Sequence, residues 1–298
     1  MKNQIKTLLL LGVLSAILIG VGGLLGSGYL HLFAGLALVM NLGAYFFSDR
    51  LVLRLHRAQE LDRRLAPEIH EIVEELSREA KIPKPRVFLI PDWQPNAFAT
   101  GRNPKNGVVA VTQGIVDLLS TRELRAVLAH EIGHIKNRDI LVATIAAAIA
   151  GIVTYVAHAT QFLALFGGLG DDGDEEGSVW GSLALAIVAP IAATLVQLGI
   201  SRSREYLADE TGARISGDPQ ALASALAKLE SAAQQIPAQN VPATASLFIV
   251  NPFAGNRTLL NLFSTHPPVR ERISNLNKLV QRNQRSRRLS WQPAWRPF

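Results

Sequence analysis

Long stretches without Asp, Glu, Lys or Arg constrain this sequence more than any other feature. One runs over residues 7–48, and two more run over 140–170 and 177–201. Because a helix needs about 20 apolar residues to cross a bilayer, the first stretch has room for two spans with a break near Gly26, and each of the others has room for one. The sequence therefore predicts a membrane protein with four transmembrane helices, the first two of which form a hairpin.

The charges between these spans predict the orientation of the chain. The loop between the third and fourth spans is acidic and has no Lys or Arg, whereas Arg50 and Arg54 follow the second span and Arg202 and Arg204 follow the fourth. Since Lys and Arg are enriched in cytoplasmic loops, we expect a multi-pass protein of the cytoplasmic membrane with both termini and both polar blocks in the cytoplasm. The basic residues behind the net charge of +6 then lie beside the membrane surface, and no nucleic-acid partner is expected.

These boundaries divide the chain into five parts. They are a hairpin of spans over 1–48, a polar block over 49–138, the third and fourth spans with their external loop over 139–200, a second polar block over 201–283 and a basic tail over 284–298. The tail carries Trp291 and Trp295 among arginines, which suits either contact with anionic lipids or a solvated, disordered end. The segment 235–256 is long enough to act as a lid.

The polar blocks are predicted to form an α+β fold that is mainly helical and contains a small β-sheet. Helical apolar spacing over 69–80 precedes strand-like runs at 86–90, 97–100 and 108–112, the last two forming a hairpin. Ser120 and Glu123 then form a capping box at the start of a helix that runs to about Arg138. The second block contains a helix over about 219–233 and another that opens after His266 and two prolines.

The helix that opens at Ser120 carries the motif His130-Glu-Ile-Gly-His134. Residues four apart share one face of a helix, so both imidazoles can bind one metal ion with Glu131 beside it. Zinc suits neutral imidazole ligands, and a catalytic zinc site keeps three protein ligands and one open position. The chain has no Cys, so His, Asp and Glu must complete the site. We expect one zinc ion per chain, with Glu131 as the general base of peptide hydrolysis.

Glu205 and Asp209 are the candidates for the remaining positions of this site. They lie one turn apart in Ser201-Arg-Ser-Arg-Glu-Tyr-Leu-Ala-Asp209. His134 lies five residues before the third predicted span and Glu205 five residues after the fourth, so the two side chains meet at one depth if those spans pack side by side. We expect Glu205 to be the third ligand and Asp209 to orient a ligand histidine.

These segments together resemble the HtpX-type integral-membrane zinc metallopeptidases, which are related to the prenyl-protein (CAAX) endopeptidases. The resemblance covers nearly the whole chain: the paired N-terminal spans, Asn96-Ala-Phe-Ala-Thr-Gly101, His130-Glu-Ile-Gly-His134, the segment from Ser201 to Asp209, and Thr265-His-Pro-Pro268. It implies a zincin-like cytosolic metallopeptidase domain on a small helical bundle, with Glu205 as the third zinc ligand. It also implies a role in stress response and protein quality control, with misfolded or damaged membrane proteins as substrates.

Two further roles are implied by this resemblance alone. Asn96, Ala97, Phe98 and Ala99 look like the family's edge strand, which can hold an extended polypeptide by main-chain hydrogen bonds. His266 looks like the family's histidine beside the cleft, where it could stabilise the developing oxyanion. The alternative interpretations are an ordinary hairpin strand and a solvent-exposed turn histidine. Arg272 is not assigned to the catalytic set.

Other functions stay open at this point. A prenyl-protein-type endopeptidase is the nearest enzymatic alternative, but four spans leave little protein to enclose a large intramembrane chamber. A non-catalytic holding protein with a structural metal site is the second, although such a site fills its ligand positions and needs no base such as Glu131. A transporter would show paired polar groups or broken helices near the bilayer midplane, and only the isolated Pro190 is found there. The oligomeric state is not defined by the sequence.

Overall fold

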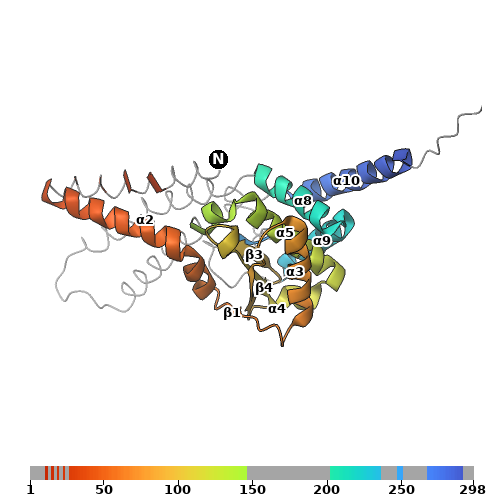
Figure 1. The fold of residues 1–298 in the computed structure, drawn as a ribbon, viewed down its shortest axis with the longest axis horizontal. Helices are drawn as coiled ribbons and strands as arrows, with labels where there is room; N and C mark the ends of the chain where they lie inside the picture. The colour runs from red at the N-terminus through yellow and green to blue at the C-terminus, as the bar shows by residue number, and fades with distance from the viewer. Residues whose placement is uncertain are drawn as a thin grey trace, which may run out of the picture.

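The computed structural model describes residues 27–145, 202–235, 247–250 and 267–290, together with a few single positions between Leu11 and Gly23. The N-terminal helix α2 (Ser27–Leu55) projects from the rest of these residues (Figure 1). Within the described part, Leu30–Leu55 is the one helix long and apolar enough to cross a membrane. Its side chains face outward, since Leu38 and Val39 are 61% and 65% exposed, as expected of a helix that contacts lipid.

The described residues test the predicted four spans only in part. Helix α2 begins directly after the predicted break at Gly26, and its Asn41 donates a hydrogen bond of 2.7 Å from Nδ2 to Oγ of Ser15 in the preceding apolar stretch. The third and fourth predicted spans lie outside the described residues except for 140–145, which are helical. The structure therefore supports one candidate span and a polar contact between the two halves of the predicted hairpin.

The first predicted segment boundary, at residue 48, falls inside α2. The helix continues past Ser48 for two more turns, to Leu55. Val52 and Leu53 are buried in this extension and pack with residues of the sheet. Burial of these two side chains stabilises the helix beyond the first charged residues, so the membrane-facing helix also forms part of the polar block.

A four-stranded sheet forms the centre of the polar block. Its order is β1 (Gln59–Glu60), β2 (Arg86–Ile90), β4 (Val108–Thr112) and β3 (Ala97–Thr100). Strand β4 is parallel to β2 and antiparallel to β3, and the turn between β3 and β4 includes the short 3-10 helix η1 (Pro104–Asn106). The three longer strands occupy the residues predicted from the sequence, and β3 lies at one edge of the sheet.

The register of β3 determines which of its backbone groups are free for a partner. The Asn96 carbonyl accepts a hydrogen bond of 2.9 Å from the Thr112 N–H, and Ala97 pairs with Val111 and Ala99 with Val109. Because hydrogen-bonded and non-hydrogen-bonded pairs alternate along antiparallel strands, the N–H and C=O groups of Ala97 and Ala99 point away from β4. The open edge of the sheet therefore presents these two alanines.

Both faces of the sheet are buried, as the period-two pattern of the strands requires. One face contributes Val87, Ala97, Ala99, Val109 and Val111 to the main core, which also contains the apolar side of α3 (Pro67–Ala80) and α5 (Thr121–Asn137). The opposite face contributes a second cluster, packed against the end of α2 and Leu247: Phe88, Ile90, Phe98, Val108 and Ala110. The sheet thus lies between α5, which carries the two motif histidines, and the end of α2.

The remaining helices are α4 (Gln113–Leu118), α8 (Arg202–Ser216), α9 (Pro219–Gln235) and α10 (Val269–Ser290). Helices α8 and α9 pack on α5, α10 packs on α9 and α8, and α4 contacts β4. Helix α10 begins one residue after Pro268, as predicted, and continues past residue 283 into the part of the chain predicted to be a basic tail. Helix α8 packs most extensively on α5 at Gly212, where an added Cβ would lie 2.8 Å from the N and Cα atoms of His130. The missing side chain lets the two helices approach closely.

Candidate metal centre

Helix α5 has well-defined ends that position the two motif histidines. At its start, Oγ of Ser120 accepts a hydrogen bond from the Glu123 N–H, and the Glu123 carboxylate accepts one from the Ser120 N–H at 3.0 Å, so the predicted capping box is present. The helix ends at Asn137 and is capped by Arg138, which adopts a left-handed backbone conformation with φ 57°. His130 and His134 therefore lie in the last two turns of a helix capped at both ends.

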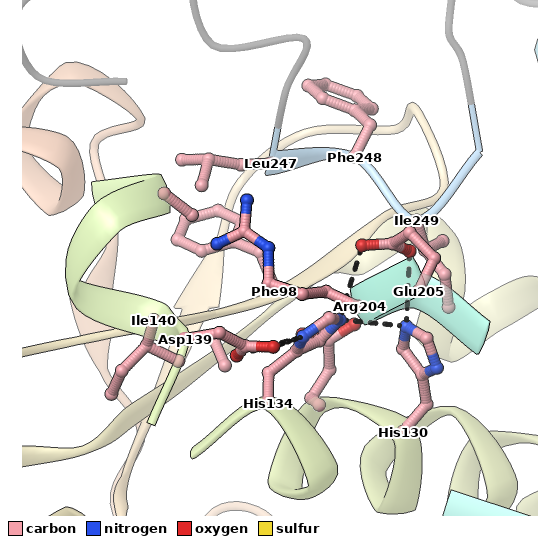
Figure 2. Close-up of a pocket in the computed structure, with 13 residues that line it drawn as sticks. Phe98, His130, His134, Asp139, Ile140, Arg204, Glu205, Leu247, Phe248 and Ile249 are labelled. Atoms are coloured by element: carbon pink, nitrogen blue, oxygen red, sulfur yellow. Dashed lines mark hydrogen bonds and ion pairs between the residues drawn. The ribbon is translucent and has the colours of Figure 1, made fainter. Parts of the chain in front are cut away.

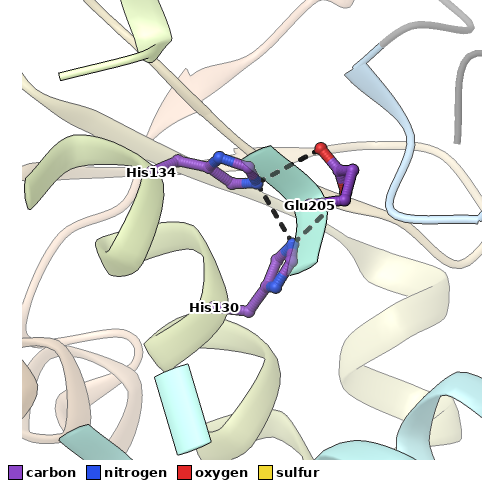
Figure 3. Close-up of side chains that lie close together, drawn as sticks. All are labelled: His130, His134 and Glu205. Atoms are coloured by element: carbon purple, nitrogen blue, oxygen red, sulfur yellow. Dashed lines mark hydrogen bonds and ion pairs between the residues drawn. The ribbon is translucent and has the colours of Figure 1, made fainter. Parts of the chain in front are cut away.

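The structure brings together the three side chains that the sequence predicts as metal ligands. Nε2 of His130 and Nε2 of His134 are 3.1 Å apart, and the Glu205 carboxylate oxygens lie 3.8 Å and 3.6 Å from them, respectively (Figure 3). One ligand atom from each residue lies within 4.8 Å of the others, so the group could hold one metal ion. Zinc–ligand bonds of about 2.0–2.2 Å require separations of this size.

Two carboxylates fix the tautomers of the histidines. Asp209 Oδ1 lies 2.9 Å from Nδ1 of His130, and both oxygens of Asp139 lie 3.2 Å from Nδ1 of His134. When each Nδ1–H donates to its carboxylate, the two Nε2 atoms turn their lone pairs toward each other across 3.1 Å. That arrangement needs a cation between the imidazoles, and the His, His and Glu donors therefore fit a divalent metal such as zinc.

The charges around the cluster favour a cation in the same position. Burial lowers the pKa of His134, but Asp139, by charge and hydrogen bond, and then Glu205 and Glu131 outweigh burial and raise that pKa to about 10. Burial also raises the pKa of Glu131, an effect opposed by His130 and His134. The cluster thus binds an additional proton where no metal neutralises its carboxylates, and it has the negative potential that a metal-binding site requires.

A buried arginine connects this cluster to the wall of the cleft. Arg272 is fully buried and donates hydrogen bonds of 2.8 Å and 2.7 Å to the two oxygens of Asp209, and one of 2.7 Å to the Ile249 carbonyl. Burial raises the pKa of Asp209, but the Arg272 guanidinium outweighs it and holds this pKa well below its usual range. Asp209 is therefore charged and held in place 2.9 Å from Nδ1 of His130.

Sequence reasoning missed Asp139 and the contacts of Arg272. Asp139 lies two residues beyond the end of α5, and the left-handed Arg138 turns the chain so that Asp139 returns to His134. Its position five residues after the second histidine was the only available signal. Arg272 follows the His266 motif by six residues, and nothing in the sequence indicates that it is buried against Asp209.

The cleft beside the cluster is lined by the sheet edge, α5, α8 and the segment 247–250. Phe98, Ala99, Glu131 and Arg204 contribute to it together with the three candidate ligands (Figure 2). The Glu131 carboxylate accepts a hydrogen bond from the backbone of Ala99, whose N–H points out of the sheet edge. The candidate general base therefore lies directly beside the open edge of β3.

The four predicted substrate-binding residues have different surroundings. Phe98 and Ala99 line the cleft, and Ala97 lies next to them in β3. Asn96 instead uses its side chain within the protein, because its Oδ1 accepts a hydrogen bond of 3.1 Å from the Ile249 N–H. His266 and most of the predicted lid at 235–256 lie outside the described residues, with 247–250 as the described part of the latter.

Comparison with known proteins agrees with this geometry. Residues 63–280, which contain every ligand candidate, match peptidase family M48. The chain belongs to peptidase family M48. Its M48 relatives include a Protease HtpX homolog of Syntrophobacter fumaroxidans, 54% identical over 283 residues, which make up 94% of this chain and 100% of the relative. These relatives confirm the predicted resemblance to the HtpX-type peptidases.

Other known proteins are similar to this chain over most of its length. A Protease HtpX homolog of Pyrococcus abyssi is 52% identical over 278 residues, covering 93% of this chain and 96% of the relative. The crystal structure of S. mikatae Ste24p aligns with 92% of this chain and 65% of that chain, at 22% identity and a TM-score of 0.49. Membership in M48 makes the chain a metallopeptidase, and α2 supplies its candidate membrane span.

Proposed function

We propose that this chain is a zinc-dependent endopeptidase of the cytoplasmic membrane that hydrolyses peptide bonds in cytosolic regions of misfolded or damaged membrane proteins. The observation that carries the proposal is the meeting of His130, His134 and Glu205 beside Glu131 and the open edge of β3. Holding a metal alone would not require a buried carboxylate that is not one of its ligands. A general base placed at the edge where a polypeptide can bind is what peptide hydrolysis requires.

Each residue of the site has a separate role in hydrolysis. His130, His134 and Glu205 would hold zinc, which supplies Lewis-acid chemistry at the scissile carbonyl. Glu131 takes a proton from the attacking water and passes it to the leaving nitrogen, and its burial raises the pKa toward the value that such a shuttle needs. His266 stabilises the oxyanion. Asp209 and Asp139 keep both histidines in the metal-binding tautomer.

An extended substrate binds along β3 in this proposal. The outward C=O groups of Ala97 and Ala99 and the N–H of Ala97 form hydrogen bonds with the main chain of the substrate, while the N–H of Ala99 donates to Glu131. Such bonds do not depend on the side chains of the substrate, which suits an enzyme that removes damaged proteins of many sequences. Asn96 supports this strand through its contact with Ile249.

The membrane arrangement is the second part of the proposal. Four spans, with both termini and the metal centre in the cytoplasm, are supported by the apolar stretches, the acidic loop and the arginines that follow the second predicted span. The absence of Cys permits a test with single introduced cysteines. Cysteines at residue 174 and at residue 63 should react with an impermeant thiol reagent from opposite sides of the membrane, and labelling of both from one side would contradict this topology.

The activity is tested with wild type and Glu131→Gln, purified in detergent and incubated with a loosely folded protein substrate. We expect zinc near one per chain in both proteins and cleavage by the wild type alone. Zinc in both proteins with equal cleavage, or with none, would contradict the assignment of Glu131 as base and would favour a non-catalytic holding protein. A prenylated and a non-prenylated peptide of the same sequence should be cleaved at similar rates, whereas strict dependence on the prenyl group would favour the prenyl-protein endopeptidase.

A further inference from the structure

Arg204 differs from its neighbours on α8 in a way that the mechanism above does not explain. Arg202, two residues earlier, is exposed, whereas Arg204 is only 8% exposed and lines the cleft next to the candidate ligand Glu205. Figure 2 shows its guanidinium extending past His134 and Glu205 toward Leu247. A charged side chain is thus placed inside the cleft rather than at the membrane surface.

One nitrogen of this side chain is buried without a partner. Among the residues that the structure describes, Nη2 of Arg204 makes no hydrogen bond. Burying a charged donor without an acceptor costs free energy comparable to a lost charge-assisted hydrogen bond. Gln94 and His56 also have buried polar atoms without hydrogen bonds but do not line the cleft, whereas Nδ1 of His130, which does, faces Oδ1 of Asp209 at 2.9 Å. Arg204 is therefore the group whose missing acceptor a ligand in the cleft can supply.

The surrounding charges indicate the chemistry of that acceptor. Asp139 and Glu205 line the same cleft and interact by charge with the guanidinium of Arg204. These two carboxylates balance the guanidinium, and Glu131 adds further negative charge to the same cleft. The guanidinium therefore needs no further charged partner, and a neutral carbonyl oxygen can accept from Nη2 without adding charge to the cleft.

We propose that Arg204 Nη2 donates a hydrogen bond to a main-chain carbonyl of the bound polypeptide. The inference rests on the proposed endopeptidase function. In it, β3 holds the substrate through the backbone groups of Ala97 and Ala99, and α8 holds the same chain through Arg204. Both contacts are made to the peptide backbone, so Arg204 contributes affinity for any extended polypeptide rather than preference for one side chain.

The test compares two fluorogenic peptides that differ only by Glu in place of Gln on each side of the cleaved bond. Arg204→Met keeps the length of the side chain and removes its donors. It should raise KM about ten- to hundredfold for both peptides by the same factor, with a smaller change in kcat and with unchanged zinc content. Arg202→Met, which removes the same charge from an exposed position of α8, is the matched control and should leave both constants near their wild-type values.

Several outcomes would overturn this inference. An unchanged KM would show that Arg204 does not bind substrate, and an effect confined to the Glu-containing peptide would assign Arg204 to a side-chain subsite. If both Arg204→Met and Arg204→Lys lose zinc or fail to fold, Arg204 is structural. A wild-type chain that cleaves neither peptide would count against the proposed function instead. Whether Arg204 binds the polypeptide would then be tested by fluorescence anisotropy of labelled peptides added to the zinc-loaded proteins. Equal peptide affinity of wild type and Arg204→Met would refute the contact.

Discussion

Replacing Gly212 with alanine should separate the two helices that carry the candidate metal ligands. The added Cβ would lie 2.8 Å from the N and Cα atoms of His130. Both atoms belong to the backbone of α5 and cannot rotate away. Ordinary contact begins at 3.4 Å, so α8 must move by about 0.6 Å relative to α5. Glu205 lies two turns before Gly212 on α8, and it moves with that helix away from His130 and His134.

Two opposing contributions determine the stability of this variant. Alanine is favoured over glycine in a helix by about 1 kcal/mol. Overpacking a close contact costs about 1–3 kcal/mol, and the upper half of this range applies because the contacts are to backbone. The free energy of unfolding should therefore fall by about 1–2 kcal/mol. Zinc affinity should fall at least about tenfold, because a shift of about 0.6 Å exceeds the tolerance of about 0.2 Å in metal–ligand distances.

Gly133→Ala is the matched comparison at the same pair of helices. Its Cβ would lie 3.2 Å from the Ala208 carbonyl oxygen and 3.5 Å from Thr211, so a shift of about 0.2 Å suffices and the gain in helix propensity offsets the cost. Zinc affinity is measured by competition with a chromophoric chelator, and stability by thermal unfolding in detergent with and without zinc. Equal zinc affinity and equal unfolding temperature for Gly212→Ala and wild type would refute the argument that this close approach positions Glu205.

Three further predictions concern groups around the site. Arg272→Met leaves the Asp209 carboxylate buried without its cation, so the free energy of unfolding should fall by about 3–5 kcal/mol and zinc affinity about tenfold or more, measured by chelator competition; wild-type values would contradict this. Burial raises the pKa of Glu123, but hydrogen bonds from Lys228, Ser224 and Ser120 outweigh it and lower this pKa to about 2. About 2 kcal/mol of the free energy of unfolding is therefore present above pH 4.5 and lost as the pH falls toward 2. Glu123→Gln should remove this pH dependence from the free energy of unfolding, and the same pH dependence in wild type and variant would refute the prediction. His266→Ala should lower kcat by about 10²–10³ with zinc content retained, and an unchanged kcat would favour a solvent-exposed histidine.

The local parts of the fold were predictable because short sequence patterns determine them. The strands at 86–90, 97–100 and 108–112 and the capped start of α5 follow from alternation, turn residues and the Ser120–Glu123 pair. The meeting of Glu205 with the two histidines was also predictable, since both groups lie at equal distances from predicted spans. These features depend on neighbours in the sequence or on chain length alone.

Contacts between distant segments were not predictable in the same way. Asn96 was interpreted as a substrate-binding residue, but its side chain contacts the backbone of Ile249, 153 positions away. The sequence does not distinguish an Arg272 beside the cleft from one that pairs with acidic neighbours, and its burial follows from two acceptors, Asp209 and Ile249, on separate segments. The extension of α2 past Ser48 likewise follows from packing of Val52 on the sheet, which no local pattern encodes.

The continuity of α2 has a consequence for where the enzyme can cut. Leu38, which is exposed in the candidate membrane span, and Val52, which packs on the sheet, belong to one unbroken helix. A rigid helix, rather than a flexible linker, therefore joins the candidate span to the domain that contains the cleft. Because α2 is rigid, it fixes the distance between the cleft and the membrane. In substrates anchored in the same bilayer, the cleavage sites should therefore lie at one distance from the membrane. Lengthening the juxtamembrane linker of a substrate should move its cleavage site along the sequence by the number of residues added.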